Sequence, residues 1–267
     1  MAPGKSKIPK CSSRAFDAAL KVGYRFIDTA IAYENEEEIG TILQGLLPKH
    51  GLTRKDIFIT SKLPPNRQGK ATESVAESLK KLRTDYIDLF LIHWPGISLK
   101  SGPDAKQKRD KSWEQLESCV DSGQLRAIGV SNYEIKHLEP MLSNRIKPAV
   151  NQCEFHPHYA TLDLKDWCNR NGIHFQAYSS LGSPIAGGSL LNDPMVLQLA
   201  KEYKCTPGQL LLAWSLCQGV SVLPRSTKPE RVAENFGATN VQFKADDIQK
   251  LAGLSGKKYC WDPKTIE

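Results

Sequence analysis

The sequence lacks the features that mark several common classes of protein. Its seven cysteines are scattered, and no two of them form a Cys-x-x-Cys pair, which argues against a disulfide framework or a zinc ribbon and fits a reducing compartment. The longest apolar stretch, residues 210–216, is too short to cross a bilayer, and the basic N-terminus lacks the apolar core of a signal peptide. We therefore expect a soluble cytoplasmic protein with no membrane partner.

The excess of positive charge does not identify a partner by itself. The net charge is +7, yet the basic residues are spread along the chain without an RGG-type run or a zinc-finger spacing. An anionic small ligand explains this excess as well as a nucleic acid does. We expect a small-molecule partner and no nucleic acid, and we expect a monomer because nothing in the sequence requires an oligomer.

Short β-branched or aromatic runs alternate with longer amphipathic segments along the chain. This alternation is typical of repeated βα units and a parallel sheet. A length of 267 residues without a linker or low-complexity segment suits a single α/β barrel. The predicted strands cover residues 24–27, 57–61, 86–93, 127–130, 149–152, 174–178 and 220–224. The predicted helices cover residues 14–22, 34–46, 71–82, 111–122, 135–142, 162–171, 195–203, 207–218 and 229–236.

The start of the chain departs from the barrel pattern. A parallel (β/α)8 TIM-type barrel needs an eighth strand, and residues 1–10 offer only Ile8 and Pro9 as material for one. We therefore predict this α/β fold as a single domain over residues 1–267, with its first strand degenerate or missing. Within it, residues 1–12 form an atypical N-terminus and a candidate for disorder, residues 99–111 an exposed loop, and residues 237–267 a C-terminal helix and short tail.

Four polar residues lie at or shortly after the ends of predicted strands: Asp28, Tyr33, Lys62 and His93. Each one alone more often serves as a cap, a packing residue or a solvated charge. The carboxyl ends of parallel strands meet on one face of a barrel, however, so we expect these side chains to converge. Reduction of a carbonyl needs a hydride for the carbon and a proton for the oxygen. A tyrosine, whose pKa is about 10, can donate that proton when a neighbouring ammonium stabilises its phenolate.

A series of longer blocks extends this pattern over residues 23–236. In chain order they are GYRFIDTAIAYENEEEIG, IFITSKL, LRTDYIDLFLIHWPG, GQLRAIGVSNY, AVNQCEFHP, AYSSLG and LPRSTKPERVAENF. With these blocks the chain resembles the aldo-keto reductase superfamily over most of its length. The resemblance implies NADPH-dependent reduction of aldehydes and ketones, with NADP+ as the oxidised cofactor and NADH as a weaker substitute. It also implies a tetrad in which Tyr33 is the general acid, Lys62 and Asp28 tune it, and His93 orients the carbonyl.

The resemblance also implies a set of cofactor contacts. Ser131, Asn132 and Gln152 match the residues that hold the nicotinamide carboxamide, and Tyr178 matches the aromatic residue on which the ring stacks. A helix N-cap is an alternative reading of Ser131 or Asn132, since a helix is predicted to follow. Further expected contacts to the pyrophosphate and adenine are Ser179, Leu181, Ser183, Glu234 and Asn235.

The segment after the last predicted strand is suited to phosphate. It places Arg225, Ser226 and Thr227 just before a helix N-terminus, which attracts anions. Arg225 and Arg231 favour the additional 2′-phosphate of NADPH, because arginine binds phosphate through two parallel hydrogen bonds. Family members usually carry lysine at the position of Arg225, which leaves the strength of this preference open.

Two further features have alternative readings. Trp94 can line the substrate pocket or pack against the top of the barrel. Residues 153–158, CEFHPH, include metal-binding residue types but lack a four-ligand set, so we expect a rim loop and no metal. The chain ends soon after Trp261. We therefore expect no long C-terminal lid and broad acceptance of small and aromatic aldehydes.

Two other functions remain as alternatives to a working reductase. The atypical N-terminus favours a cofactor-binding regulatory protein or a catalytically impaired barrel. An unrelated phosphate-handling barrel isomerase would also use an anion site after the last strand. That third reading leaves Tyr33, Lys62 and Tyr178 without an explanation.

Overall fold

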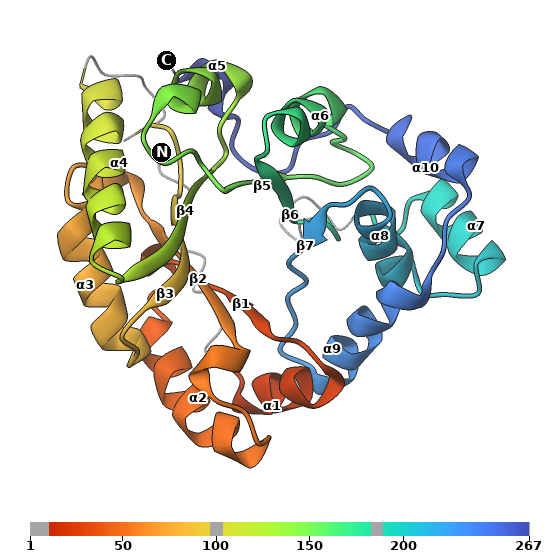
Figure 1. Cartoon of the computed structure of the whole chain (residues 1–267). Coiled ribbons are helices and arrows are strands. Elements are labelled where there is room, and N and C mark those ends of the chain that lie inside the picture. The colour runs from red at the N-terminus through yellow and green to blue at the C-terminus, as the bar shows by residue number, and fades with distance from the viewer. Residues whose placement is uncertain (1–10, 97–103, 183–188, 267) are drawn as a thin grey trace.

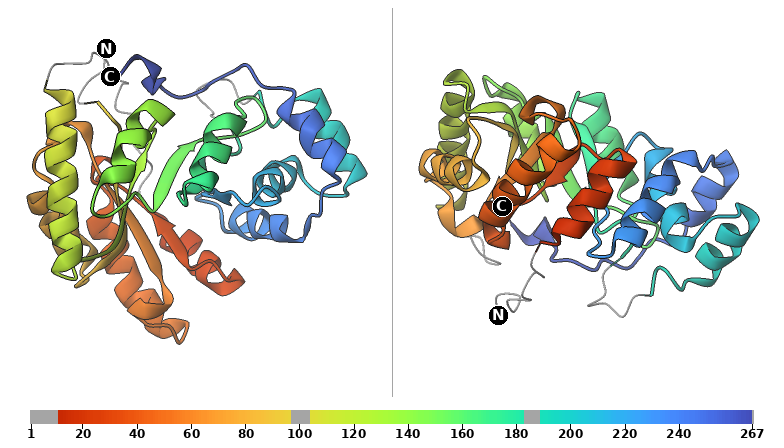
Figure 2. Two further views of the ribbon diagram at one scale, coloured as in Figure 1. Left: turned by 45° about the horizontal axis from the view of Figure 1, so that its top comes forward. Right: turned by 90° about the horizontal axis from the view of Figure 1, so that it is seen from below.

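The computed structural model describes residues 11–96, 104–182 and 189–266. Within these residues seven strands form one parallel sheet in the order of the sequence. The sheet curls, and helices cover its outer side (Figures 1 and 2). The strands are β1 (Phe26–Asp28), β2 (Phe58–Leu63), β3 (Ile87–Ile92), β4 (Leu125–Ser131), β5 (Val150–Glu154), β6 (His174–Tyr178) and β7 (Ser221–Val222).

Some of the helices begin and end at residues with clear capping chemistry. Helix α1 starts after Ser12, whose hydroxyl accepts a hydrogen bond from the backbone N–H of Ala15, and it ends at Gly23, whose φ of 115° few other residues adopt. Helix α8 starts with Pro207 in its first turn and a reciprocal capping box between Thr206 and Gln209. The helices are α1 (Ser13–Val22), α2 (Glu36–Lys49), α3 (Ala71–Leu82), α4 (Ala105–Asp121), α5 (Ile135–Leu138), α6 (Leu162–Arg170), α7 (Pro194–Glu202), α8 (Pro207–Leu216), α9 (Pro229–Phe236) and α10 (Ala245–Ala252).

The predicted class and the seven predicted strands agree with the structure, but two local predictions were wrong. From Ala105 onward the predicted loop over residues 99–111 is helical, because α4 begins there. Its first turns expose mostly charged side chains, so they lack the apolar periodicity that marks a helix. The predicted helix over residues 135–142 ends after Leu138 and continues as a 3-10 helix, Glu139–Ser143, in which Pro140 cannot donate an α-helical hydrogen bond.

Burial follows the position of each strand in the sheet. All six residues of β3 are buried, as expected for a central parallel strand covered on both faces. Strands β1 and β7 each pair on one side only, and no ladder joins them in the described part of the chain. Phe26 at the start of β1 is 65% exposed. The described sheet is therefore curled but not closed by hydrogen bonds.

Helices connect the two ends of the sheet where strands do not. Helix α1 packs against α9, and the two lie side by side in Figure 1. The rings of Tyr24 and Phe236 meet edge to face, with centroids 5.0 Å apart. A Cβ atom on Gly23 would lie 3.0 Å from the Phe236 ring, so the close approach of the two helices favours glycine there. We call this contact between α1 and α9 the seam.

A buried carboxylate joins β2, β3 and β4 near their amino ends. Asp88 is 2% exposed and accepts a hydrogen bond of 2.9 Å from the backbone N–H of Ile59. It also pairs with Arg54 at 2.6 Å and Arg126 at 3.0 Å. The two guanidinium groups lie over the ring of Tyr86, at 4.1 and 3.9 Å from its centroid. The buried carboxylate of Asp88 is therefore paired with two guanidinium groups.

We expect Asp88→Ala to lower the free energy of unfolding by about 3 kcal/mol, because it leaves the guanidinium groups and a buried N–H without their acceptor. Urea unfolding measures this change. Asp121→Ala is the matched control: Asp121 pairs with Arg145 on the surface at 2.9 Å, and such pairs contribute less than about 1 kcal/mol. An equal decrease in the free energy of unfolding in both variants would contradict the stabilising effect assigned to Asp88.

No helix in the described residues is long and apolar enough to span a membrane.

Candidate active site

The carboxyl ends of β1, β2 and β3 bring the four predicted tetrad residues together. Asp28 is the last residue of β1, Lys62 lies one residue before the end of β2, and His93 directly follows β3. Tyr33 closes a 3-10 turn, Ile31–Tyr33, that follows β1. Parallel pairing forces this convergence, since each strand end lies beside the next.

The ammonium group of Lys62 is the buried centre of the site. Its Nζ lies 2.5 Å from Oδ1 of Asp28 and donates a hydrogen bond of 2.8 Å to the backbone oxygen of Thr29. Burial acts to lower the pKa of Lys62, but the carboxylate of Asp28 and the hydroxyl of Tyr33 outweigh it, so the pKa is raised. Lys62 is therefore a permanent positive charge at neutral pH.

Tyr33 lies between this ammonium and an imidazole. Nζ of Lys62 is 5.0 Å from the centroid of the Tyr33 ring. The ring of His93 meets Tyr33 edge to face, with centroids 5.7 Å apart and planes 82° apart. A positive charge beside a phenol favours the phenolate, which makes the phenol a better proton donor.

His93 is held in its neutral form. Burial and the positive charge of Lys62 together lower the pKa of His93 to about 3. Its Nδ1 atom is buried and has no hydrogen-bond partner among the described residues. A neutral imidazole carries one N–H, so His93 can donate a single hydrogen bond to a substrate oxygen.

The residues predicted to hold the nicotinamide carboxamide form a continuous hydrogen-bond network. Asn132 donates to the backbone oxygen of His93 at 3.0 Å and accepts from the hydroxyl of Tyr178 at 2.6 Å. Ser131 donates to the backbone oxygen of Gln152 at 2.7 Å. The helix N-cap reading of Ser131 and Asn132 was wrong, because Glu134 caps α5. Burial raises the pKa of Tyr178, so its hydroxyl stays protonated and donates.

Gln152 connects this network to the tetrad. Its Nε2 donates to Oδ2 of Asp28 at 2.8 Å and to Oε1 of Gln176 at 2.8 Å. The first of these bonds crosses the interior from β5 to β1. Sequence reasoning missed Gln176, although its place two residues before Tyr178 on β6 gives both side chains the same face of the sheet.

The residues predicted to bind phosphate lie beyond β7, apart from the tetrad. Arg225, Thr227 and Arg231 are exposed, and the hydroxyl of Ser226 accepts a hydrogen bond from the backbone N–H of Lys228 at 3.1 Å. Lys228 is the N-cap of α9, so this cluster lies at the positive end of that helix. Among the described residues, no hydrogen bond or ion pair joins these four predicted ligands to the tetrad.

The other predicted cofactor contacts differ in burial and in local structure. Glu234 accepts a hydrogen bond from the hydroxyl of Thr206 at 2.7 Å, and Asn235 is buried. Ser179 adopts a left-handed backbone with a φ of 53°, and Leu181 packs against the main core. Ser183 lies outside the described residues.

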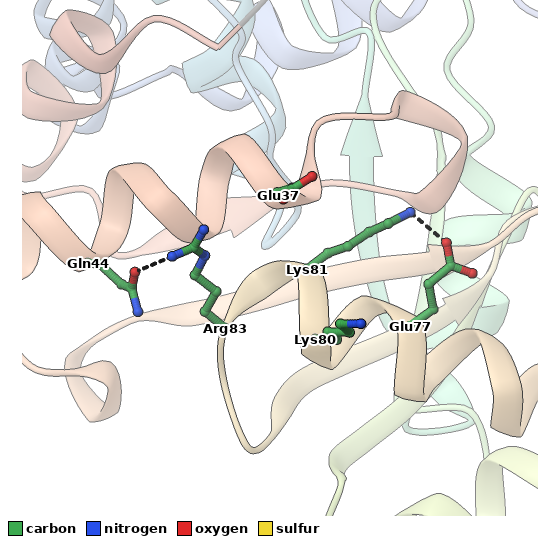
Figure 3. Close-up of a pocket in the computed structure, with 6 residues that line it drawn as sticks. All are labelled: Glu37, Gln44, Glu77, Lys80, Lys81 and Arg83. Carbon is green, nitrogen blue, oxygen red and sulfur yellow. Dashed lines mark hydrogen bonds and ion pairs between the residues drawn. The ribbon is translucent and has the colours of Figure 1, made fainter.

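A surface groove elsewhere on the protein does not overlap the tetrad. It has a volume of about 670 Å³ and lies along α2 and α3 (Figure 3). Its side chains already pair with one another, as Gln44 does with Arg83 at 2.9 Å and Glu77 with Lys81 at 2.6 Å. None of the predicted site residues lines it. The lining residues are Glu37, Gln44, Glu77, Lys80, Lys81 and Arg83.

The curled parallel sheet and the polar cluster at its strand ends define an α/β-barrel protein with a candidate active site. Residues 5–255 match the Aldo/keto reductase family. A relative named glyoxal reductase from Bacillus subtilis is 38% identical over 247 residues, which are 91% of this chain and 83% of the relative. Methylglyoxal reductase DkgA from Salmonella typhimurium is 35% identical over 251 residues, or 93% of this chain and 86% of that protein.

A solved structure agrees with these sequence matches. The aldo-keto reductase MGS-M4 from a Medee basin deep-sea metagenome library superimposes with a TM-score of 0.85 at 34% identity, covering 96% of this chain and 90% of that one. The chain belongs to the aldo/keto reductase family, and the predicted (β/α)8 barrel class is confirmed. It is an oxidoreductase of a family that acts on carbonyl compounds.

The depressed pKa of His93 predicts a specific dependence of stability on pH. The unfolded chain protonates this histidine near pH 6.5, whereas the folded protein does so only near pH 3. The unfolded state therefore binds more protons between these values, and acidification destabilises the fold by about 1 kcal/mol per pH unit through this residue. The free energy of unfolding, measured with urea at pH 6.5 and at pH 5, should fall less on acidification in His93→Gln than in the wild type. Identical losses would mean that His93 titrates normally.

Proposed function

We propose that this protein reduces aldehydes and ketones to alcohols with NADPH, and that Tyr33 is the general acid. The observation that carries the proposal is the placement of Tyr33 between a buried ammonium and a neutral imidazole, 5.0 Å and 5.7 Å from the ring centroid. Lys62 supplies a positive charge beside the phenol, and Asp28 holds Lys62 in place at 2.5 Å. His93 orients the carbonyl oxygen toward the phenol.

The residues near the tetrad fit a nicotinamide dinucleotide. The amide and hydroxyl groups of Ser131, Asn132 and Gln152 match a carboxamide in donors and acceptors. The hydroxyl of Ser180, next to the pyrophosphate contact expected at Ser179, is buried and has no hydrogen-bond partner within the described part of the chain. When bound, the reduced nicotinamide supplies a hydride to the carbonyl carbon. The phosphate ligands would be Arg225, Ser226, Thr227 and Arg231, with Glu234 and Asn235 at the adenine.

The protein's own residues move the proton. A carbonyl oxygen placed between the Tyr33 hydroxyl and the His93 N–H accepts hydrogen bonds from both. Tyr33 transfers its proton to this oxygen as negative charge develops there, and the ammonium of Lys62 stabilises the resulting phenolate. A positioned general acid of this kind contributes about 10²- to 10⁴-fold to the rate.

The relatives named glyoxal reductase and methylglyoxal reductase support a preference for small, reactive carbonyl compounds. We extend this to small and aromatic aldehydes, since Trp94 stacks beside His93 with ring centroids 6.2 Å apart. The seven cysteines are all free, which supports a cytoplasmic location. We further propose a monomer that binds no nucleic acid.

A second candidate function is a cofactor-binding protein without useful turnover. The observation that favours it is the lack of a ladder between β7 and β1 in the described residues, which leaves the two ends of the sheet joined through helices. Binding of NADPH by a purified wild-type chain that turns over no aldehyde would favour this candidate.

We expect Tyr33→Phe to lower kcat for a reactive aromatic aldehyde by at least about 100-fold, because the variant loses the donated proton. The change should leave the Kd for NADPH within about twofold, since a phenol and a phenyl ring occupy similar space. Oxidation of NADPH and fluorescence titration measure the two quantities.

Tyr203→Phe is the matched control for this variant. It removes a hydroxyl that donates to Asp247 at 2.7 Å and lies away from the tetrad, so turnover should be unchanged. A Tyr33→Phe enzyme that still turns over at the wild-type rate would reject Tyr33 as the acid.

The choice between the two nucleotides is tested at Arg225. We expect Arg225→Gln to weaken NADPH binding by roughly 10-fold, the loss typical of one charged hydrogen bond, and to leave NADH binding unchanged. Fluorescence titration with each nucleotide measures both constants. Arg170→Gln, on the exposed end of α6, should change neither. If binding of both nucleotides were weakened equally, Arg225 would not be a ligand of the 2′-phosphate.

A further inference from the structure

The last part of the chain returns across the strand ends after α10. It runs from α10 back toward α5, where the C-terminus lies (Figures 1 and 2). The backbone N–H groups of Gly256 and Lys257 donate to the backbone oxygen of His158 at 2.9 and 2.7 Å. Further on, the ring of His137 lies 2.9 Å from the backbone oxygen of Ile266. We call residues 256–261 the C-terminal strap.

One buried carboxylate fixes the middle of the C-terminal strap. Glu154, the last residue of β5, is 1% exposed. Its Oε1 accepts a hydrogen bond from the backbone N–H of Tyr259 at 2.6 Å, and its Oε2 accepts one from that of Cys260 at 3.0 Å. Nζ of Lys258 lies 3.1 Å from Oε2. Three successive residues of the strap therefore bind the same side chain.

Glu154 is a stronger anchor than a surface ion pair. The ring of His156 lies 3.0 Å from Oε1 and adds a further polar contact to this carboxylate. Burial acts to raise the pKa of Glu154, but His156, Lys258 and the N–H of Tyr259 lower it to about 2. A charge buried this deeply keeps its partners because their removal leaves it uncompensated.

The strap beyond this anchor lies against the candidate active site. Sγ of Cys260 is 3.7 Å from the hydroxyl of Ser179, the residue after Tyr178. The ring of Trp261 packs on Trp94, with centroids 4.6 Å apart and planes 50° apart. Trp94 in turn stacks on His93 at 6.2 Å. A row of rings thus runs from the tetrad to the strap.

We propose that Glu154 is a positioning residue: it fixes the C-terminal strap so that Trp261 and Trp94 form an aromatic wall beside His93, which favours carbonyl substrates with a planar aromatic group. This inference rests on the proposed reductase function. The wall acts through contact with the part of the substrate that does not react, so it changes the choice of substrate more than the chemistry. One aromatic contact corresponds to roughly a 2- to 10-fold preference.

The first measurement is amide hydrogen exchange of the strap in Glu154→Gln. The substitution keeps the size of the side chain but removes its charge, and its single NH2 group replaces one of the two oxygens that accept hydrogen bonds from the strap. We expect the amides of Tyr259 and Cys260 to exchange about 10-fold faster, because a hydrogen bond to a charged group is the stronger kind. Unchanged exchange in this variant and in Glu154→Ala would overturn the anchoring.

Glu117→Gln is the matched control. Glu117 on α4 is also buried, at 9% exposure, accepts a backbone hydrogen bond from Ile146 at 2.8 Å and pairs with Arg145 at 3.5 Å. It therefore reports the general cost of neutralising a buried carboxylate. Strap exchange and substrate preference should stay at wild-type values in this variant.

The second measurement is the ratio of kcat/KM for 4-nitrobenzaldehyde to that for methylglyoxal. Because it is a ratio within one preparation, any inactive fraction cancels. We expect Glu154→Gln and Trp261→Ala each to lower it by roughly 3- to 10-fold, the value of a lost aromatic contact. Only Glu154→Gln should also speed the hydrogen exchange of the strap amides. A faster-exchanging strap with an unchanged ratio would overturn the selection of substrates while leaving the anchor in place.

These outcomes separate the inference from the proposed function. A wild-type chain without turnover refutes the reductase and with it the aromatic selection. The exchange experiment decides the anchoring by Glu154 in either case, because it needs no substrate.

Discussion

The charge of Lys62, buried without exposure to water, is the constraint on which the site depends. Removing an ammonium from water costs several kcal/mol, and the fold must supply partners that offset this cost. Asp28 at 2.5 Å and the backbone oxygen of Thr29 at 2.8 Å do so. Because Asp28 also accepts a hydrogen bond from Gln152, compensation of one charge fixes β1, β2 and β5 relative to one another. The proposed acid, Tyr33, then lies beside a charge that these two partners hold in place.

Much of this site could be predicted from the sequence, because parallel strands bring their carboxyl ends to one edge. Asp28, Lys62 and His93 each occupy such an end, so knowing the strands was enough to place them together. The bond from Gln152 to Asp28 could not be predicted this way, since it crosses the interior and depends on how strongly the sheet curls. The start of α4 was missed for another reason: its first turns are almost all polar, and a helix without an apolar face resembles a loop in sequence.

Glu154 shows how one pattern can support readings with different chemistry. In the sequence, the carboxylate and the histidines of CEFHPH resemble metal ligands, whereas in the structure Glu154 binds backbone N–H groups and Lys258, and His158 lies between Tyr259 and Asp193. Except for Asp193, these partners come from residues about a hundred positions later, in a segment without regular secondary structure. Only the fold shows that these residues meet. The same side chain therefore couples the end of β5 to the strap that lies beside the tetrad.

The residues proposed to transfer the proton and those predicted to bind phosphate lie on different sides of the seam. The tetrad lies on β1, β2 and β3, where Asp28 is held by its pairing with Thr60 and by its bonds to Lys62 and Gln152. None of these contacts involves the open side of β1. The predicted phosphate ligands Arg225 and Arg231 instead follow β7, on the other side of the opening, where α9 packs on α1 through Phe236 and Tyr24. A cofactor that spans both groups thus depends on helix packing for the distance between them, whereas the proton donor does not. Loosening the seam should therefore weaken nucleotide binding before it disturbs the tetrad.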